Sequence, residues 1–304
     1  MKISFVIPCY RSSRSITGVV DDIEKELTEK GLDFQVVLVN DSSPDETWKT
    51  LRDLSGRSYV TAIDLARNFG QHAAIMAGLH YAEGDLICCL DDDGQTPVSE
   101  FHKLLTKLEE GFDVVYAAYE KKKHSGFRNL GSRLNDKMLE TMLNKPKGLY
   151  MSSYFLARRF VIDKILEYDY PYPYLMGLVL RTTNRIANVP VEHHERMEGT
   201  SGYSIAKLLA LWMNGFTAFS VKPLRVASFL GGILAAFGIV YLIYALINKI
   251  INPAAPMGWT SIMGGMFLIG SMILIMLGVI GEYLGRLYIS ENRSPQYVIR
   301  EVIR

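Results

Sequence analysis

Short apolar runs alternate with helical patterns across the first 120 residues of the chain. The runs occupy residues 3–7, 34–39, 59–65, 85–90 and 113–118. Strands that alternate with helical segments are typical of βαβ units, in which helices cover both faces of a parallel sheet. The pattern therefore predicts an α/β fold built on a Rossmann-like parallel sheet.

Two proline positions predict where helices begin. Pro44 and Pro97 each follow a hydroxyl residue and precede acidic residues, a combination typical of the first turn of a helix. We therefore expect helices to begin there, after the second and fourth strands. A basic amphipathic helix is predicted over residues 126–143, and a further helix over residues 161–166.

The hydrophobic pattern changes after residue 204. Residues 204–225 mix aromatic and apolar side chains with a few basic ones, which predicts a helix in the membrane interface, with a buried core helix as the alternative. Residues 226–248 and 260–281 carry no charge, and each run exceeds the ~20 apolar residues that cross a bilayer. Two transmembrane helices are predicted, and a hairpin buried in a soluble protein is the alternative.

These segments divide the chain into four parts. We expect a folded domain over residues 1–203, an interfacial region over 204–225, two transmembrane helices within 226–284, and a tail over 285–304. Basic residues flank the outer ends of the two spans, whereas the link between them carries only Lys249. The positive-inside rule then places both termini in the cytoplasm.

Charge and cysteine content narrow the function classes. Lys and Arg number 33 against 32 acidic residues, so the net charge of +1 gives no reason to expect nucleic acid as a partner. Cys9, Cys88 and Cys89 suit neither a disulfide framework nor a metal quartet. The first apolar run is broken by Pro8 and is too short for a signal peptide. We therefore expect the first domain to stay in the cytosol.

Acidic residues follow two of the predicted strands. Residues 40–45 (NDSSPD) follow the second strand and residues 90–95 (LDDDGQ) follow the fourth. An open parallel sheet binds ligands beyond the carboxyl ends of its strands. Asp91 and Asp93 can point to one side, and clustered carboxylates need a cation or a proton. Mg²⁺ or Mn²⁺ held by Asp93 and Gln95 beside a diphosphate fits this pattern, with a solvated acidic turn as the alternative.

Several motifs occur in an order that resembles family 2 glycosyltransferases. They are FVIPCY at 5–10, VNDSSPD at 39–45, RNFGQHAA at 67–74, and the acidic end of the fourth strand. The C-terminal half adds HxRxxGxSxY at 194–203, GEYLGR at 281–286 and RSPxY at 293–297. Within the family the chain looks most like the polyprenyl-phosphate branch, which includes dolichol-phosphate mannose synthases and bactoprenol glucosyl transferases. The resemblance implies that residues 1–203 form a catalytic domain of the GT-A type that binds a nucleotide sugar.

The resemblance also implies roles for individual residues. Those expected to bind the donor are Pro8, Tyr10, Asp41, Asp91 and Asp92. Those expected to hold the metal are Asp93 and Gln95. Those expected to act in catalysis are Asp91, Asp93, Arg128, Ser132, Arg196 and Ser201. The last four of these are expected to bind the acceptor phosphate. Arginine binds phosphate bidentately, which agrees with this assignment.

Two positions depart from the family pattern. Ser153 stands where many relatives carry an aspartate that is proposed as general base, and Asp92 stands where relatives usually carry a small residue. A serine cannot remove a proton from an attacking sugar hydroxyl. A phosphate monoester has a second pKa of about 6 and is largely dianionic at neutral pH, so its oxygen can attack without a base. The departure at Ser153 therefore favours a lipid phosphate acceptor.

The sequence thus predicts metal-dependent, inverting transfer from a nucleotide diphosphate sugar to polyprenyl phosphate, such as undecaprenyl phosphate, at the inner membrane of a bacterial-type cell. Glucose, mannose, galactose and modified amino sugars all fit, on UDP or GDP, with a UDP-sugar as the working hypothesis. A processive polysaccharide synthase is one alternative, although the chain has no QxxRW string. An inactive membrane scaffold is the other. Glycines in the second span predict a homo-oligomer, with a tetramer as the hypothesis.

Overall fold

The computed structural model describes most of the N-terminal domain and one long helix. The described residues are 1–119, 140, 145–192, 258–291 and 294–304, together with twelve helical positions between 229 and 251. The chain forms two compact units. One contains Met1–Trp212 and Arg293–Arg304, and the other contains Met213–Asn292. The four predicted parts of the chain differ from these units in their boundaries and stay a prediction.

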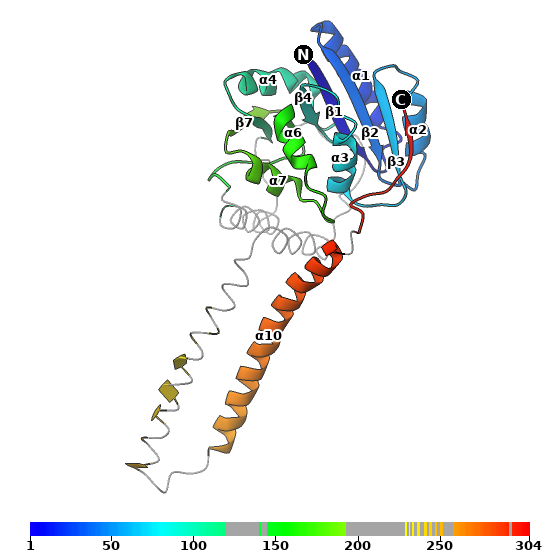
Figure 1. Cartoon of the computed structure of the whole chain (residues 1–304). Helices are drawn as coiled ribbons and strands as arrows, with labels where there is room; N and C mark the ends of the chain where they lie inside the picture. The colour runs from blue at the N-terminus through cyan, green and yellow to red at the C-terminus, as the bar shows by residue number, and fades with distance from the viewer. Residues whose placement is uncertain are drawn as a thin grey trace. The chain divides into compact units, whose positions relative to one another are not determined.

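The first unit is built on a sheet of eight strands with the order β7-β5-β6-β4-β1-β2-β3-β8 (Figure 1). The strands are β1 (Lys2–Cys9), β2 (Asp33–Asn40), β3 (Val60–Leu65), β4 (Leu86–Cys89), β5 (Val114–Tyr119), β6 (Phe155–Arg158), β7 (Ile186–Val191) and β8 (Ile299–Ile303). The five strands expected from the apolar runs are confirmed as β1 to β5.

The predicted parallel sheet is confirmed in part, because the sheet is mixed. β6 lies between β4 and β5 and is antiparallel to both, and β8 is antiparallel to β3. The other six strands run parallel to one another. β6 and β8 are only four and five residues long, so neither shows a periodicity that would reveal it. β7 tolerates Pro190 because it is the edge strand, where a missing N–H breaks no ladder.

Helices cover both faces of this sheet. They are α1 (Ile16–Glu29), α2 (Thr47–Leu54), α3 (Gln71–Leu79), α4 (Phe101–Glu109), α6 (Arg159–Leu166) and α7 (Leu175–Thr182). The helix expected over 161–166 is confirmed as α6. The helix expected after Pro97 begins as the short 3-10 turn η1 (Val98–Glu100), which leads into α4. The helix expected at Pro44 begins three residues later, at Thr47.

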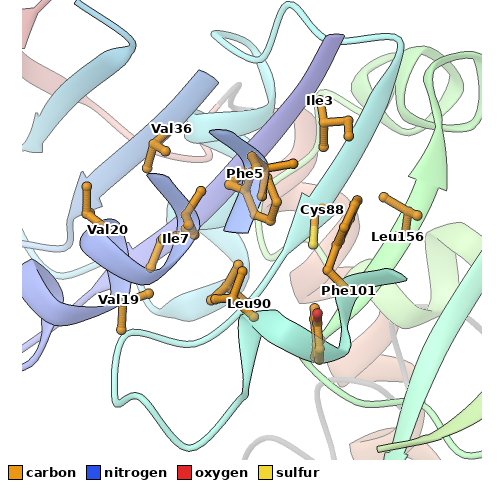
Figure 2. Close-up of a cluster of buried hydrophobic side chains, with 14 of the residues drawn as sticks. Ile3, Phe5, Ile7, Val19, Val20, Val36, Cys88, Leu90, Phe101 and Leu156 are labelled. Carbon is orange, nitrogen blue, oxygen red and sulfur yellow. The ribbon is translucent and has the colours of Figure 1, made fainter. Parts of the chain in front are cut away.

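An apolar core lies between the sheet and the layer that contains α1 and α4 (Figure 2). Ile3, Phe5 and Ile7 alternate along β1 and point into this core, where the Phe5 ring packs 5.4 Å from the ring of Phe101. The other face of β1 packs against α3, where a Cβ built on Gly78 would lie 2.5 Å from Val6 Cγ1. β1 is therefore buried on both faces, which explains why it reads as a continuous apolar run.

The second unit contains the long helix α10 (Trp259–Glu291) of 33 residues. Its segment Leu268–Gly285 is long and apolar enough to cross a membrane, and none of that segment is buried inside the structure. At 1.5 Å per residue α10 is about 50 Å long, which exceeds the ~30 Å thickness of a hydrocarbon core. α10 contains the predicted span 260–281. The predicted span 226–248 is described only at scattered helical positions and residues 204–225 lie outside the described part, so a pair of spans is not confirmed.

Candidate functional site at the carboxyl edge of the sheet

Loops from three neighbouring strands meet at one edge of the sheet. β4, β1 and β2 are adjacent and parallel, so their carboxyl ends lie side by side. The loops that follow these strands contain Tyr10, Asp41 and residues 91–95. The backbone N–H of Asp41 donates to the carbonyl of Cys9 at 3.0 Å, which ties the first two loops together. Pro8 lies near the end of β1, opposite Val39 of β2. The fold thus brings the predicted donor-binding residues to one edge.

Asp41 holds the loop that leads into α3. Its carboxylate accepts hydrogen bonds from the backbone N–H of Phe69 at 2.7 Å and of Gly70 at 2.9 Å. Gly70 has a φ of 90°, a conformation that favours glycine. Burial raises the pKa of Asp41, and the two backbone donors oppose that rise. Asp41 is only 4% exposed, and its contact with a nucleotide stays a prediction.

Asp92 joins the end of β4 to the loop that follows β1. Its Oδ2 atom accepts from the backbone N–H of Tyr10 at 3.0 Å and from the hydroxyl of Ser12. Burial raises the pKa of Asp92, while these donors favour its charged form. The contact fixes the backbone of Tyr10, whose side chain is 46% exposed and faces outward. Asp92 can therefore orient the donor loop even without touching a donor itself.

Asp91 is held from two sides. Gln71, the first residue of α3, donates from Nε2 to Asp91 Oδ1 at 2.9 Å, and the hydroxyl of Ser153 donates to Oδ2. Burial raises the pKa of Asp91 to about 6, with further increases from the charges of Asp93 and Asp92, and the two hydrogen bonds oppose the rise. Ser153 thus lies at the site and fixes the orientation of a carboxylate. The contacts of Gln71 and Ser12 were not predicted, although Gln71 belongs to the quoted motif at 67–74.

The residues predicted to hold a metal lie in a tight turn after β4. The backbone N–H of Gln95 donates to Asp93 Oδ1 at 3.1 Å, and Gly94 has a φ of 68°. Within the described residues, no group of three or more His, Cys, Asp or Glu side chains could by itself hold a metal ion. Asp93 and Gln95 offer oxygen ligands, which Mg²⁺ prefers together with substrate phosphates. Burial is the main cause of the raised pKa values of Asp91 and Asp92, and the charge of Asp93 raises both further. A divalent cation beside these three consecutive aspartates would offset that charge, so the residues fit such an ion.

The residues predicted to grip the acceptor phosphate fall outside the part of the chain that the structure describes. They are Arg128, Ser132, Arg196 and Ser201. The predicted basic helix over 126–143 also falls there, apart from Glu140, which is helical. The acceptor side of the site therefore stays a prediction.

Asp45 organises the loop between β2 and α2. Its carboxylate accepts from the hydroxyl of Ser13 at 2.8 Å, the hydroxyl of Thr47 at 2.6 Å and the backbone N–H of Thr47 at 3.2 Å. These bonds explain why the helix begins at Thr47 and not at Pro44, because the Asp45 carboxylate accepts a hydrogen bond from the backbone N–H of Thr47, the first helical residue. Burial raises the pKa of Asp45, but hydrogen bonds from Ser43, Thr47 and Ser13 outweigh it and hold that pKa well below its ordinary value.

We expect Asp45→Asn to destabilise the protein by about 1 kcal/mol at pH 7, because the charged acceptor is lost. A depressed folded-state pKa contributes stability above the unfolded-state pKa of about 3.9, and this contribution is lost as the pH falls below it. The gap in thermal midpoint between wild type and variant should therefore narrow from pH 5 to pH 3. Asp53→Asn, at an exposed position on α2, is the control. A gap that stays constant with pH would contradict the assignment.

His72 is a shielded imidazole at the start of α3. Its Nδ1 atom is buried without a hydrogen-bond partner, and its ring packs edge-on against Tyr174 at 5.6 Å. Burial lowers the pKa of His72 to about 4. The folded state therefore keeps this side chain neutral at pH values where the unfolded chain, with a pKa near 6.5, binds a proton.

We expect this histidine to make the protein less stable in mild acid. The unfolded state gains a proton as the pH falls below about 6.5 and the folded state does not, so stability should drop by about 2 kcal/mol between pH 7 and pH 5. His72→Phe should flatten this part of the profile of thermal midpoint against pH. His102→Gln, on the exposed side of α4, should leave the profile unchanged. An equally steep profile in His72→Phe would refute the assignment.

The layered α/β sheet and the acidic loop at its carboxyl edge define a class, the glycosyltransferases of GT-A-like fold. Residues 4–166 match the model described as Glycosyl transferase family 2, and residues 222–287 match one described as GtrB C-terminal hairpin. The first match covers more than half of the chain. The chain therefore belongs to glycosyl transferase family 2 and is a glycosyltransferase.

Curated relatives match the chain along almost its whole length. It is 32% identical over 306 residues to an undecaprenyl-phosphate 4-deoxy-4-formamido-L-arabinose transferase of Enterobacter sp. (strain 638), covering 99% of this chain and 94% of the relative. The protein of that name from Proteus mirabilis (strain HI4320) is 32% identical over 310 residues, again covering 99% and 94%. These relatives place the chain in the polyprenyl-phosphate branch of the family, as the motifs predict.

Solved structures share the fold at lower identity. Mannosyl-3-phosphoglycerate synthase from Rubrobacter xylanophilus has a TM-score of 0.54 at 18% identity, covering 74% of each chain. Glucosyl-3-phosphoglycerate synthase from Mycobacterium tuberculosis, in complex with Mn²⁺, UDP-glucose and phosphoglyceric acid, has a TM-score of 0.53 at 19% identity, covering 70% of this chain and 76% of that one. The likeness establishes the fold.

Proposed function

We propose that this enzyme transfers a sugar from a UDP-sugar to undecaprenyl phosphate at the cytosolic face of a membrane, with inversion at the anomeric carbon. The observation that carries the proposal is the near full-length match to transferases named for undecaprenyl phosphate. The match covers 99% of this chain, so it includes the long apolar segment between β7 and β8 as well as the strands of the sheet.

The position of Ser153 supports a phosphate acceptor. Its hydroxyl donates to Asp91, so position 153 contributes a hydroxyl and not a further carboxylate to the acidic end of β4. A sugar hydroxyl needs a base as it attacks, whereas a phosphate monoester is already largely dianionic at neutral pH. A site without a base at position 153 suits the phosphate. Asp91, oriented by Gln71 and Ser153, can then accept a hydrogen bond from a hydroxyl of the donor sugar.

The loops at the carboxyl edge support a nucleotide diphosphate donor. Tyr10 and Asp41 would contact the nucleoside, and Asp93 with Gln95 would hold Mg²⁺ or Mn²⁺. Such an ion, when bound, would neutralise charge that develops on the leaving diphosphate. Arg128 and Arg196 would grip the acceptor phosphate, with Ser132 and Ser201 beside them. Displacement would then occur in line, at the anomeric carbon between the two phosphate-bearing partners.

The position of β8 supports two membrane crossings. β8 comes from residues 299–303 and pairs with β3, so both belong to one continuous sheet. A bilayer cannot divide a sheet, hence the chain between β7 and β8 must cross an even number of times. If α10 crosses once, one further crossing lies between residues 192 and 258, where residues 226–248 carry no charge. Both termini would then share the cytosolic side.

Transfer into lipid tests the reaction directly. Purified full-length protein in detergent is incubated with radiolabelled UDP-sugars and GDP-sugars, undecaprenyl phosphate, and Mg²⁺, Mn²⁺ or EDTA. We expect label in the organic phase that depends on metal and on one donor. Undecaprenol, which lacks the phosphate, is the matched control acceptor and should take up no label.

The other outcomes point to other functions. Label on undecaprenol would contradict a phosphate acceptor. Nucleotide binding without labelled lipid would indicate a different acceptor, such as a growing polysaccharide. Failure to bind any nucleotide would favour an inactive scaffold.

A further inference from the structure

The C-terminal strand places one arginine against a buried acid at the end of β3. Arg300 Nη1 lies 3.1 Å from Asp64 Oδ2, and Arg300 Nη2 donates to the carbonyl of Ala66 at 2.9 Å. The Asp64 side chain is 3% exposed and the Arg300 side chain 59% exposed. The guanidinium therefore covers a buried carboxylate at the edge of the sheet where the donor loops lie.

Asp64 connects Arg300 to the donor loops through hydrogen bonds. Its Oδ1 atom accepts from Asn40 Nδ2 at 2.7 Å, and Asn40 Oδ1 accepts from the backbone N–H of Ser43 at 3.1 Å. The hydroxyl oxygen of Ser43 accepts from the backbone N–H of Arg11 at 2.8 Å. A continuous chain of hydrogen bonds thus links Arg300 to the loops after β2 and β1, which contain Asp41 and Tyr10.

These two loops contain backbone strain that needs support. Arg11 has a φ of 61° and Ser42 a φ of 50°, in the left-handed region that residues other than glycine avoid. Each such residue costs about 1 kcal/mol or more, so it persists only where neighbouring contacts determine the conformation. The hydrogen bond between Ser43 and Asn40 and the one between Arg11 and Ser43 support the strained conformations of Arg11 and of the residue before Ser43.

We propose that Arg300 is a positioning residue for donor binding, acting through Asp64 and Asn40 on the loops that receive the nucleotide. The inference rests on the proposed function for the location of the donor site. The strand that contains Arg300 follows the long apolar helix in the sequence, so the segment C-terminal to the membrane region completes the support of the donor loops. Removing the guanidinium would leave Asp64 buried without its charge partner and free the loops to adopt other conformations.

A second ion pair on the same strand provides the matched control. Arg52 Nη2 on α2 lies 3.2 Å from Glu301 Oε2, and both side chains are about half exposed. This pair also fastens β8 to the domain, but its contacts lead to α2 and not to the donor loops. Glu301→Gln therefore tests whether β8 matters merely as a strand. Exposed pairs contribute at most about 1 kcal/mol.

Calorimetric titration of UDP and of GDP, each with Mn²⁺, into full-length protein in detergent tests the inference. For the nucleotide that wild type binds, Arg300→Gln should raise Kd about tenfold, as expected if the loops are competent for roughly a tenth of the time. Arg300→Lys keeps the charge but not the paired hydrogen bonds, and should raise Kd about threefold. Glu301→Gln should stay within about twofold of wild type.

Kinetics and a double variant separate positioning from loss of structure. Arg300→Gln should raise KM for the donor about tenfold, with KM for undecaprenyl phosphate and kcat at saturating donor within about twofold of wild type. Combining it with Asn40→Ala should raise Kd no more than the larger single effect, because both act through one chain of bonds. The titrations are made well below the thermal midpoint of each variant, so unfolding does not enter.

Each outcome decides the matter. Unchanged nucleotide affinity in Arg300→Gln would overturn the inference and leave the proposed function intact. An equal loss of nucleotide affinity in Glu301→Gln would also overturn the inference. Fully additive effects of Arg300→Gln and Asn40→Ala on Kd would overturn it as well. If wild type binds neither nucleotide, the proposed donor site itself fails and the inference fails with it.

Discussion

Replacing Asp93 by alanine should lower sugar transfer on the order of a thousandfold while leaving the fold intact. Asp93 lies in the turn after β4, where its carboxylate accepts from the backbone N–H of Gln95. An ion held there would act on charge that develops as the diphosphate leaves, and losing one such electrostatic contact costs about two to three orders of magnitude in rate. The measurement is kcat/KM for transfer into undecaprenyl phosphate at saturating Mg²⁺ or Mn²⁺.

Asp53→Ala is the matched control, because it removes an aspartate from an exposed position on α2, away from the carboxyl edge. It should keep wild-type activity. A second readout follows the ion itself: Mn²⁺ with UDP should raise the thermal midpoint of wild type and of Asp53→Ala, but not that of Asp93→Ala. Wild-type transfer by Asp93→Ala would overturn the metal assignment. Equal stabilisation of Asp93→Ala by Mn²⁺ with UDP would show that the ion binds elsewhere.

Replacing Gly84 by alanine should destabilise the protein by about 3 kcal/mol or more. A Cβ at this position would lie 2.6 Å from the backbone nitrogen of Ser4 and 2.8 Å from the carbonyl oxygens of Lys2 and Leu86. These atoms belong to the paired strands β1 and β4, so none of them can move without breaking the ladder. A loss of this size should lower the thermal midpoint by about 10 °C in a domain of this length.

Gly18→Ala is the contrasting substitution. Gly18 lies exposed within α1, and a Cβ there would meet no heavy atom within 4 Å. Because alanine favours a helix by up to about 1 kcal/mol over glycine, this variant should have an equal or higher midpoint. The two variants make the same chemical change, so their difference isolates the close approach of backbone at Gly84. A Gly84→Ala protein as stable as wild type would show that the loop before β4 can shift.

The serine at position 153 and the apolar helix suit the same proposed acceptor. Undecaprenyl phosphate presents an anionic oxygen at the membrane surface, so an enzyme that accepts it needs basic residues and proximity more than it needs a proton acceptor. The hydroxyl of Ser153 donates to Asp91, and under the proposed function the phosphate oxygen attacks without a base at position 153. The near full-length match to undecaprenyl-phosphate transferases agrees with a phosphate acceptor.

The pattern of apolar and acidic residues along the chain predicts the parallel strands of the sheet and the edge where the candidate site lies. Strands β1 to β5 are visible because strands covered on both faces are apolar almost throughout. The location of Asp41, Asp91 and Asp93 follows from the general rule that ligands bind beyond the carboxyl ends of parallel strands. Both inferences rest on local patterns, which a single chain displays directly.

The antiparallel strands and the partners of the acidic residues are evident only in the folded chain. β6 and β8 are short. Each pairs with a strand that is distant in the sequence, and no local pattern of residues indicates that pairing. The same holds for the contacts of Asp91 with Ser153 and of Asp64 with Arg300, which join residues 62 and 236 positions apart in the sequence. A side chain such as Ser153 shows its role only when folding brings its partner within hydrogen-bonding distance, because its own sequence neighbours do not reveal that partner.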